Sequence, residues 1–139
     1  MSSSSSAAAA TAAPAKPPIT CHILDTTIGR PATGVRCTLL QFSADAPTVE
    51  STARVVATGT TDADGRVASW SGGVDAGELV LKQGAAYKIR FEVEEYFARM
   101  GQETFFPFVE VAFRVRGVDE HYHVPLLLAG WGYSTYRGS

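Results

Sequence analysis

Hydrophobic and polar residues alternate along most of the chain after residue 18, a pattern that predicts short strands. The alternation is cleanest from Ala86 to Val93 and from Phe108 to Val115. Residues 94–100 have helical composition, and Gly101 is placed to end that helix. Further strands are expected, between Gly, Asp and Pro residues, over 19–24, 35–42, 54–60, 67–70, 121–128 and 132–137. The pattern predicts an all-β fold, a two-sheet β-sandwich with one short α-helix.

The first eighteen residues differ in kind from the rest. They contain no aromatic residue and one charged side chain, and they end in the pair Pro17-Pro18. Such a segment cannot bury enough apolar surface to offset the cost of ordering its backbone. We therefore expect a disordered Ser/Ala/Pro-rich tail over residues 1–18 and one domain over 19–139. Deleting residues 2–18 is expected to change neither activity nor melting temperature.

Charge and composition exclude several classes of protein. The net charge is −2 and Lys and Arg are scattered, so we expect no nucleic-acid partner. No apolar run approaches the roughly 20 residues of a membrane-spanning helix, so no membrane partner is expected. Cys21 and Cys37 stand among apolar strand residues and are expected to be reduced and buried. The N-terminus lacks the features of a secretory signal, so we expect a cytoplasmic protein. A peroxisomal location stays open, although the chain does not end in Ser-Lys-Leu.

Polar chemistry gathers near the end of the chain. Within HYHVPLLL, alternation places His121 and His123 on one face of the strand and Tyr122, Val124, Leu126 and Leu128 on the other. His22 in the first strand also lies opposite an apolar face. A solvent-facing histidine is the alternative for each, and most of all for His121 at a strand start. The terminal YRGS adds a phenol, a guanidinium, a hydroxyl and the chain carboxylate, which predicts a site here.

Three segments resemble the 5-hydroxyisourate hydrolases, the transthyretin-like enzymes of urate breakdown. They are CHILDTTIGRPATGV (Cys21 to Val35), TDADGR (Thr61 to Arg66) and the ending HYHVPLLL…YRGS. The similarity runs from about Ile19 to Ser139, with Ala129-Gly130 where the family usually has Ser-Pro. The resemblance implies a transthyretin (prealbumin) topology. In it, the first strand, the short strand after the Asp64-Gly65 turn and the last two strands share one sheet. The outer face of that sheet lines a channel between paired dimers.

The same resemblance assigns roles to particular residues. It implies that His22, Arg66, His123 and Ser139 are catalytic, and that His22, Arg66 and Tyr136 bind the substrate. Each residue also has a plain structural interpretation, Arg66 as a solvated turn residue and Tyr136 as the cap of a hydrophobic edge. Histidine suits proton transfer because its pKa of about 6.5 leaves both forms available near neutrality. Which histidine is the general base stays open.

The implied reaction is a cofactor-free hydrolysis carried out by a homotetramer, a dimer of dimers. Water attacks the ring amide of 5-hydroxyisourate between C6 and N1 and gives 2-oxo-4-hydroxy-4-carboxy-5-ureidoimidazoline. A metal site is disfavoured because no Cys or carboxylate stands at ligand spacing beside the histidines. The alternative function is that of a small-molecule carrier, since transthyretin uses the same fold. A purely structural domain would leave the polar residues unexplained.

Overall fold

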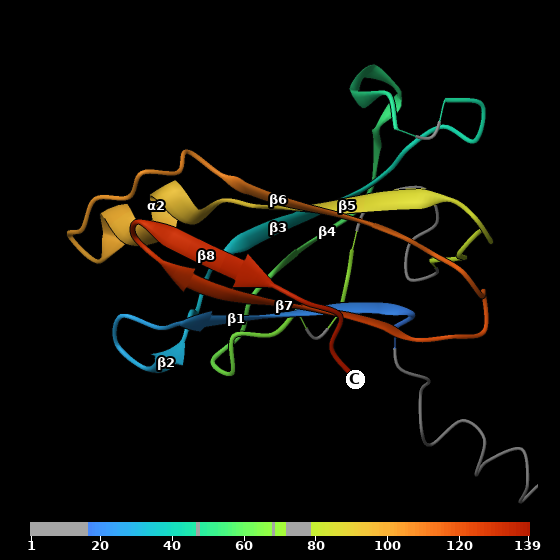
Figure 1. Cartoon of the computed structure of the whole chain (residues 1–139). Coiled ribbons are helices and arrows are strands. Elements are labelled where there is room, and N and C mark those ends of the chain that lie inside the picture. Colours follow the sequence, from blue (N-terminus) through green and yellow to red (C-terminus); the bar gives the residue numbers. More distant parts are fainter. Residues whose placement is uncertain (1–16, 47, 68, 72–78) are drawn as a thin grey trace, which may run out of the picture.

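A computed structural model of the chain describes residues 17–46, 48–67, 69–71 and 79–139. The predicted tail therefore lies outside the described residues except for Pro17 and Pro18. The elements, shown in Figure 1, are β1 (Ile19–Asp25), β2 (Arg30–Pro31), β3 (Arg36–Gln41), the 3-10 turn η1 (Glu50–Thr52), β4 (Arg54–Thr60), β5 (Ala86–Phe91), α2 (Val93–Arg99), β6 (Val109–Arg114), β7 (Tyr122–Ala129) and β8 (Gly132–Thr135).

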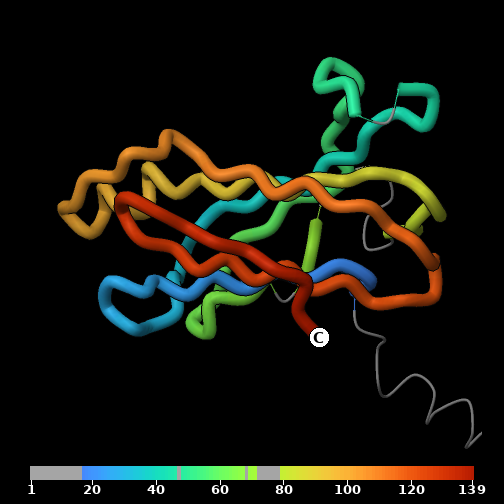
Figure 2. The backbone as a smooth tube through the Cα atoms, viewed as in Figure 1, coloured from blue at the N-terminus to red at the C-terminus, as the bar shows by residue number. Residues whose placement is uncertain are grey.

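The strands form two sheets that stack face to face (Figures 1 and 2). The first sheet has the order β2-β1-β7-β8 and the second the order β4-β3-β5-β6. β1 and β7 are parallel, and the other neighbouring pairs are antiparallel. The C-terminus leaves β8 and ends on the outer side of the first sheet, away from the second sheet (Figure 2). This confirms the predicted transthyretin-like two-sheet sandwich.

The core lies between the two sheets and is built from alternate residues of each strand. In β1 the burial alternates along the whole strand, and Ile19, Cys21 and Ile23 are fully buried. The other large contributors come from β3, β5, α2 and β7: Leu39, Tyr87, Ile89, Phe91, Phe97, Leu126 and Leu128. The faces predicted from alternation in β1 and β7 are confirmed, so His22 and His123 lie on the outward face of the first sheet.

The segment after the Asp64-Gly65 turn does not form the strand predicted over residues 67–70. Arg66 makes a single antiparallel bridge with His22 of β1, and Ser71 makes another with Thr58 of β4. Of the four residues in question, 67, 69 and 70 are described and belong to neither ladder. The segment crosses from the first sheet at Arg66 to the second sheet at Ser71. Five residues are too few to pair along a strand of either sheet as well.

The helix α2 closes one end of the sandwich and stops where the sequence predicts. Gly101 has a φ of +70°, a left-handed conformation that glycine adopts without steric cost. The N–H of Gln102 donates to the carbonyl of Phe97 at 2.9 Å, and that of Gly101 donates to Ala98 at 3.0 Å. These two bonds are the Schellman pattern that ends a helix.

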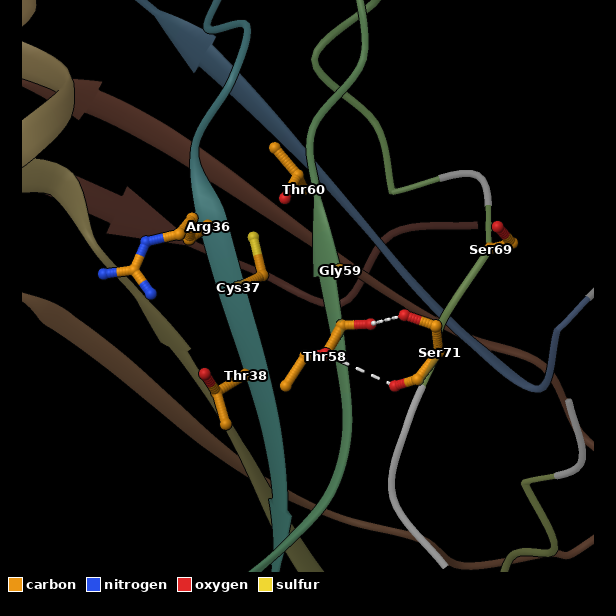
Figure 3. A pocket seen from close by; sticks show the side chains of 8 residues that line it. All are labelled: Arg36, Cys37, Thr38, Thr58, Gly59, Thr60, Ser69 and Ser71. Atoms are coloured by element: carbon orange, nitrogen blue, oxygen red, sulfur yellow. Dashed lines mark hydrogen bonds between the residues drawn. The ribbon is translucent and has the colours of Figure 1, made fainter. Parts of the chain in front are cut away.

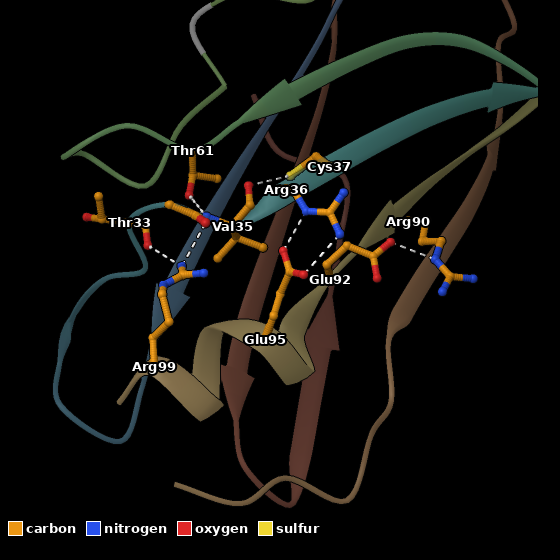
Figure 4. Close-up of polar contacts among 10 residues, drawn as sticks. Thr33, Val35, Arg36, Cys37, Thr61, Arg90, Glu92, Glu95 and Arg99 are labelled. Atoms are coloured by element: carbon orange, nitrogen blue, oxygen red, sulfur yellow. Dashed lines mark hydrogen bonds and ion pairs between the residues drawn. The ribbon is translucent and has the colours of Figure 1, made fainter. Parts of the chain in front are cut away.

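Polar contacts fix α2 against β3 and the loop before it (Figure 4). Arg36 binds both carboxylate oxygens of Glu95, at 2.6 and 2.9 Å. Arg99 donates to the carbonyl of Gly34 at 2.7 Å. Because these side chains are exposed to solvent, each ion pair or hydrogen bond contributes little to stability. Their main effect is to hold the helix in place.

The two cysteines are buried and carry free thiols. Cys21 belongs to the first sheet and Cys37 to the second, and a hydrogen bond between their sulfurs, together with burial, raises the pKa of Cys37. A thiol held protonated in this way is a poor nucleophile. In the described part of the chain no helix combines the length and apolar character needed to span a membrane.

Candidate functional site

The Asp64-Gly65 turn places Arg66 beside His22. The N–H of Ile23 donates to the carbonyl of Gly65 at 2.8 Å. On the other side of His22 and Arg66, the N–H of Val67 donates to the carbonyl of Cys21 at 3.4 Å. The two bonds flank His22 and Arg66, which are therefore a non-hydrogen-bonded antiparallel pair. In such a pair the Cα atoms approach to about 4.5 Å and both side chains lie on one face. Arg66 and His22 thus share the outward face of the first sheet.

The turn itself is held by the side chain of Asp62. Its carboxylate accepts hydrogen bonds from the backbone N–H groups of Asp64 at 2.9 Å and Arg66 at 3.1 Å. Gly65 has a φ of +74°, and a Cβ there would lie 2.5 Å from the carbonyl oxygen of Ile23. Glycine is required both by this conformation and by the close approach of the turn to β1. The predicted turn is confirmed, and its packing on β1 explains the position of Arg66.

His22 is surrounded by groups with opposing effects on its pKa. Partial burial of its ring lowers the pKa most, and the positive charge of Arg66 lowers it further. A hydrogen bond to the backbone of Asp64 and the charges of Asp62 and Asp64 raise it. The net effect lowers the pKa from 6.5. His22 is therefore predominantly neutral at physiological pH, as a proton acceptor must be.

β7 places the second histidine beside the first. Parallel pairing sets Thr20 opposite His123 and His22 opposite Pro125. The rings of His22 and His123 are stacked, with centroids 6.4 Å apart and an angle of 20° between their planes. The hydroxyl of Thr20 lies 2.8 Å from Nδ1 of His123. We call this surface, which carries Thr20, His22, Arg66 and His123, the histidine face.

The end of the chain returns to the histidine face. The N–H of Gly138 donates to the carbonyl of His123 at 2.8 Å. A Cβ at Gly138 would lie 2.5 Å from Cδ2 of the His123 ring and 3.0 Å from Cγ of Pro125. The chain end therefore runs directly against the imidazole. This contact brings the terminal segment to the edge of the histidine face.

The register of β7 and β8 accounts for the placement of Tyr136. Leu127 is opposite Ser134, and Gly138 bridges His123 four residues further along. Continuing the register between these pairs sets Tyr136 opposite Pro125, on the outward side. Its side chain is 59% exposed, so most of the phenol remains accessible. Strand register therefore places Tyr136 beside the histidine face.

Arg137 points the other way and serves structure. Its guanidinium lies 4.6 Å from the centroid of the Tyr122 ring and forms an ion pair with Glu120 at 3.0 Å. Tyr122 is buried, and its hydroxyl accepts from the N–H groups of residues 116 and 117. Arg137 therefore anchors the terminal segment to the domain while its neighbours stay on the histidine face.

Sequence interpretation gave no role at this face to three residues: Pro17, Thr20 and His121. It placed His121 on the face of His123 but favoured an exposed strand-start residue, yet the His121 ring contacts both of the others. Thr20 could have been found because it lies two residues before His22 in the same strand. The contact of Pro17 depends on where the chain enters β1, which no motif indicates.

The structure offers no competing site of comparable chemistry among the residues it describes. None of their His, Cys, Asp and Glu side chains gather in threes to hold a metal ion. A shallow polar hollow of about 340 Å³ lies on the second sheet (Figure 3). Its charged group, Arg36, is engaged by Glu95. The lining residues, none of them a predicted site residue, are Arg36, Cys37, Thr38, Thr58, Gly59, Thr60, Ser69 and Ser71.

The chain belongs to the HIUase/Transthyretin family, whose profile matches residues 19–138. It is 44% identical over 126 residues to a probable 5-hydroxyisourate hydrolase of Schizosaccharomyces pombe, covering 91% of this chain and 94% of the yeast protein. These matches confirm the resemblance proposed from the three sequence segments.

Two solved structures are close to this fold. One is the 5-hydroxyisourate hydrolase of Klebsiella pneumoniae, 30% identical with a TM-score of 0.65, which covers 87% of this chain and 98% of the bacterial one. The other is sea bream transthyretin in complex with thyroxine, 27% identical with a TM-score of 0.70. That match covers 87% of this chain and 94% of the transthyretin. The fold therefore serves both an enzyme and a hormone-binding protein, and the site must distinguish them.

Proposed function

We propose that this chain is a hydrolase of 5-hydroxyisourate in urate catabolism. The observation that carries the proposal is the convergence of His22, Arg66, His123 and the chain end on one face of the first sheet. These groups come from β1, the Asp64-Gly65 turn, β7 and the terminal segment. Core packing explains none of them, because each lies on an outward face. The names of the yeast and Klebsiella relatives support the same substrate.

Each group has a distinct part in the proposed reaction. His22 and His123 orient a water molecule and take its proton as it attacks C6 of the ring amide. Arg66 binds the flat anionic ring with its fork of donors and stabilises negative charge on the carbonyl oxygen. Tyr136 and Ser139 position substrate or water at the edge of the face. The bond between C6 and N1 then breaks, and the proton from water is delivered to N1.

A carrier function is the alternative, and sea bream transthyretin with thyroxine illustrates it. A carrier of an apolar hormone has no use for a neutral histidine beside an arginine. In this chain the same surface holds His22, Arg66 and His123 within one group of neighbouring strands. These polar side chains favour an enzyme over a carrier.

We also propose that the protein assembles as a homotetramer, a dimer of dimers. β8 and β6 stand at the edges of their sheets, where backbone groups are available to a second copy. Beside them lies an aromatic cluster made of Phe105, Phe106, Trp131 and Tyr133, in which every ring except that of Phe106 is exposed. Phe105 and Trp131 are 68% and 71% exposed and stack on each other. Such a cluster is typical of a buried subunit contact. A stable monomer in sedimentation velocity at micromolar concentration would contradict assembly.

An assay of 5-hydroxyisourate decay tests the function directly. Urate oxidase generates the substrate from urate in the cuvette, and its absorbance is followed with and without this protein. His22→Ala, Arg66→Ala and His123→Ala should each lower kcat/KM by roughly 10²–10⁴-fold while the fold stays intact. Arg54→Ala, on the exposed surface of the second sheet, is the matched control and should keep full activity. Wild-type protein that does not accelerate the decay would refute the function.

A further inference from the structure

A continuous chain of hydrogen-bonding groups leads to Nδ1 of His123. Nδ1 of His121 lies 3.0 Å from the backbone carbonyl oxygen of Pro17. Nε2 of the same ring lies 3.1 Å from the hydroxyl of Thr20. That hydroxyl lies 2.8 Å from Nδ1 of His123. Four groups are therefore joined in one chain of contacts: one from the chain entry, one from β1, one from the residue just before β7 and one from β7.

The carbonyl at the start of this chain of contacts fixes its direction. A carbonyl oxygen only accepts, so Nδ1 of His121 must carry a proton. In the neutral imidazole Nε2 is then an acceptor, and it takes the hydroxyl hydrogen of Thr20. The oxygen of Thr20 is left to accept, and the group that faces it is Nδ1 of His123. When His121 is neutral, every contact in this chain is a hydrogen bond with one donor and one acceptor only if Nδ1 of His123 is protonated.

We propose that Thr20 and His121 are positioning residues that hold His123 as the Nδ1–H tautomer, which makes its Nε2 atom the general base. The inference rests on the proposed function and names the atom that acts in it. Nε2 takes a proton from water as the water oxygen bonds to C6. When the C6–N1 bond breaks, Nε2 returns that proton to N1, and His123 is again neutral.

The geometry of the two strands suits this role. Parallel register sets Thr20 directly opposite His123, and His121 is two residues earlier on the same side. The N–H of Tyr122 donates to the carbonyl of Pro18 at 2.8 Å, which fixes the entry of the chain beside β7. Nδ1–H of His123 keeps its acceptor in both protonation states of Nε2. The ring is therefore held in one orientation through the whole cycle.

The first test is the tautomer itself, measured without substrate. Nitrogen-15 NMR distinguishes protonated from unprotonated ring nitrogens, and the His123 signals are assigned by their loss in His123→Gln. We expect wild type and Thr20→Ser to show the Nδ1–H tautomer. Thr20→Val has nearly the same shape but no hydroxyl, and it should shift His123 toward the Nε2–H form. An unchanged His123 tautomer in Thr20→Val would overturn the proposal.

Kinetics then connect the tautomer to catalysis. Thr20→Val should lower kcat by roughly 10–10³-fold with little change in KM, because the base and not the binding group is altered. Thr20→Ser should restore most of the rate. A second variant, His121→Phe, keeps the ring volume but lacks both nitrogens, and it should lower kcat in the same way. If Thr20→Val folds poorly, His121→Phe tests the positioning role independently.

The outcomes separate this inference from the function on which it rests. An inactive wild type refutes the proposed hydrolase. An active wild type with an equally active Thr20→Val refutes the positioning role alone. Equal losses in Thr20→Ser and Thr20→Val would also refute it, since the hydroxyl would then not be the cause.

Discussion

At the scale of residues, the candidate site depends on side chains that alternation directs away from the core. His22 and His123 occupy strand positions whose neighbours are buried, so packing neither selects nor excludes them. Sequence pattern predicted both faces correctly. It could not predict that the hydroxyl of Thr20 joins His121 to His123, because that contact depends on the register of two strands about a hundred residues apart.

The charge of Arg66 should be measurable through the pKa of His22. Because Arg66 lowers that pKa, Arg66→Gln should raise it, while Arg66→Lys should keep it low. Titration of the ring signals by NMR gives the pKa in each variant. The sign also fixes a stability effect: as pH falls below about 6.5, the unfolded chain binds the proton first and the folded state loses stability. A His22 pKa that is the same in Arg66→Gln as in the wild type would mean that the guanidinium lies too far away to act.

At the scale of elements, the Asp64-Gly65 turn places Arg66 beside His22 of β1 without forming a strand. Sequence analysis identified the turn from its dipeptide and assigned a strand after it. The strand is absent from residues 67, 69 and 70 because the chain leaves for β4 immediately. Local pattern describes the turn well, but the sheet that the next residues join is a tertiary property. One bridge between His22 and Arg66 is sufficient for the site.

Gly65→Ala should therefore cost more than an ordinary glycine substitution. Gly65 and Gly84 both have positive φ, at +74° and +81°, so alanine at either position costs roughly 1–2 kcal/mol of backbone strain. A Cβ at Gly84 meets nothing within 4 Å, whereas one at Gly65 would clash with Ile23 and Pro31. Gly65→Ala should lower both stability and turnover, and Gly84→Ala only stability. Chemical denaturation and the decay assay provide the comparison, and similar losses in both variants would argue against a close turn–strand contact.

At the scale of the whole molecule, the histidine face lies on the outward side of the first sheet, where the second sheet does not cover it. In the proposed tetramer a second copy would cover this face, and the aromatic cluster predicts where copies meet. Trp131→Glu should place a charge in the subunit contact and shift the protein to smaller species in sedimentation velocity. Val55→Glu makes the same change at an exposed valine of β4, on the far edge of the second sheet, and should leave assembly unchanged. Identical behaviour of the two variants would exclude Trp131 from the interface.

Truncation of the chain end should distinguish residues needed for the fold from residues needed for hydrolysis. Removing Arg137, Gly138 and Ser139 takes away one surface ion pair and the contact with Tyr122, but no core side chain. The truncated protein should keep its assembly in size-exclusion chromatography and lose hydrolysis, because His123 loses the backbone that packs on its ring. A C-terminal tag should act similarly, since it moves the terminal carboxylate.

Glu120→Gln is the matched control for this truncation. It removes the negative charge that pairs with Arg137 and leaves the terminal segment intact, so activity should persist. A truncated protein that stays assembled and fully active would show that the terminal motif lies outside the site. If the truncated chain dissociates instead, the motif serves assembly. Turnover would then be lost because no second copy covers the histidine face.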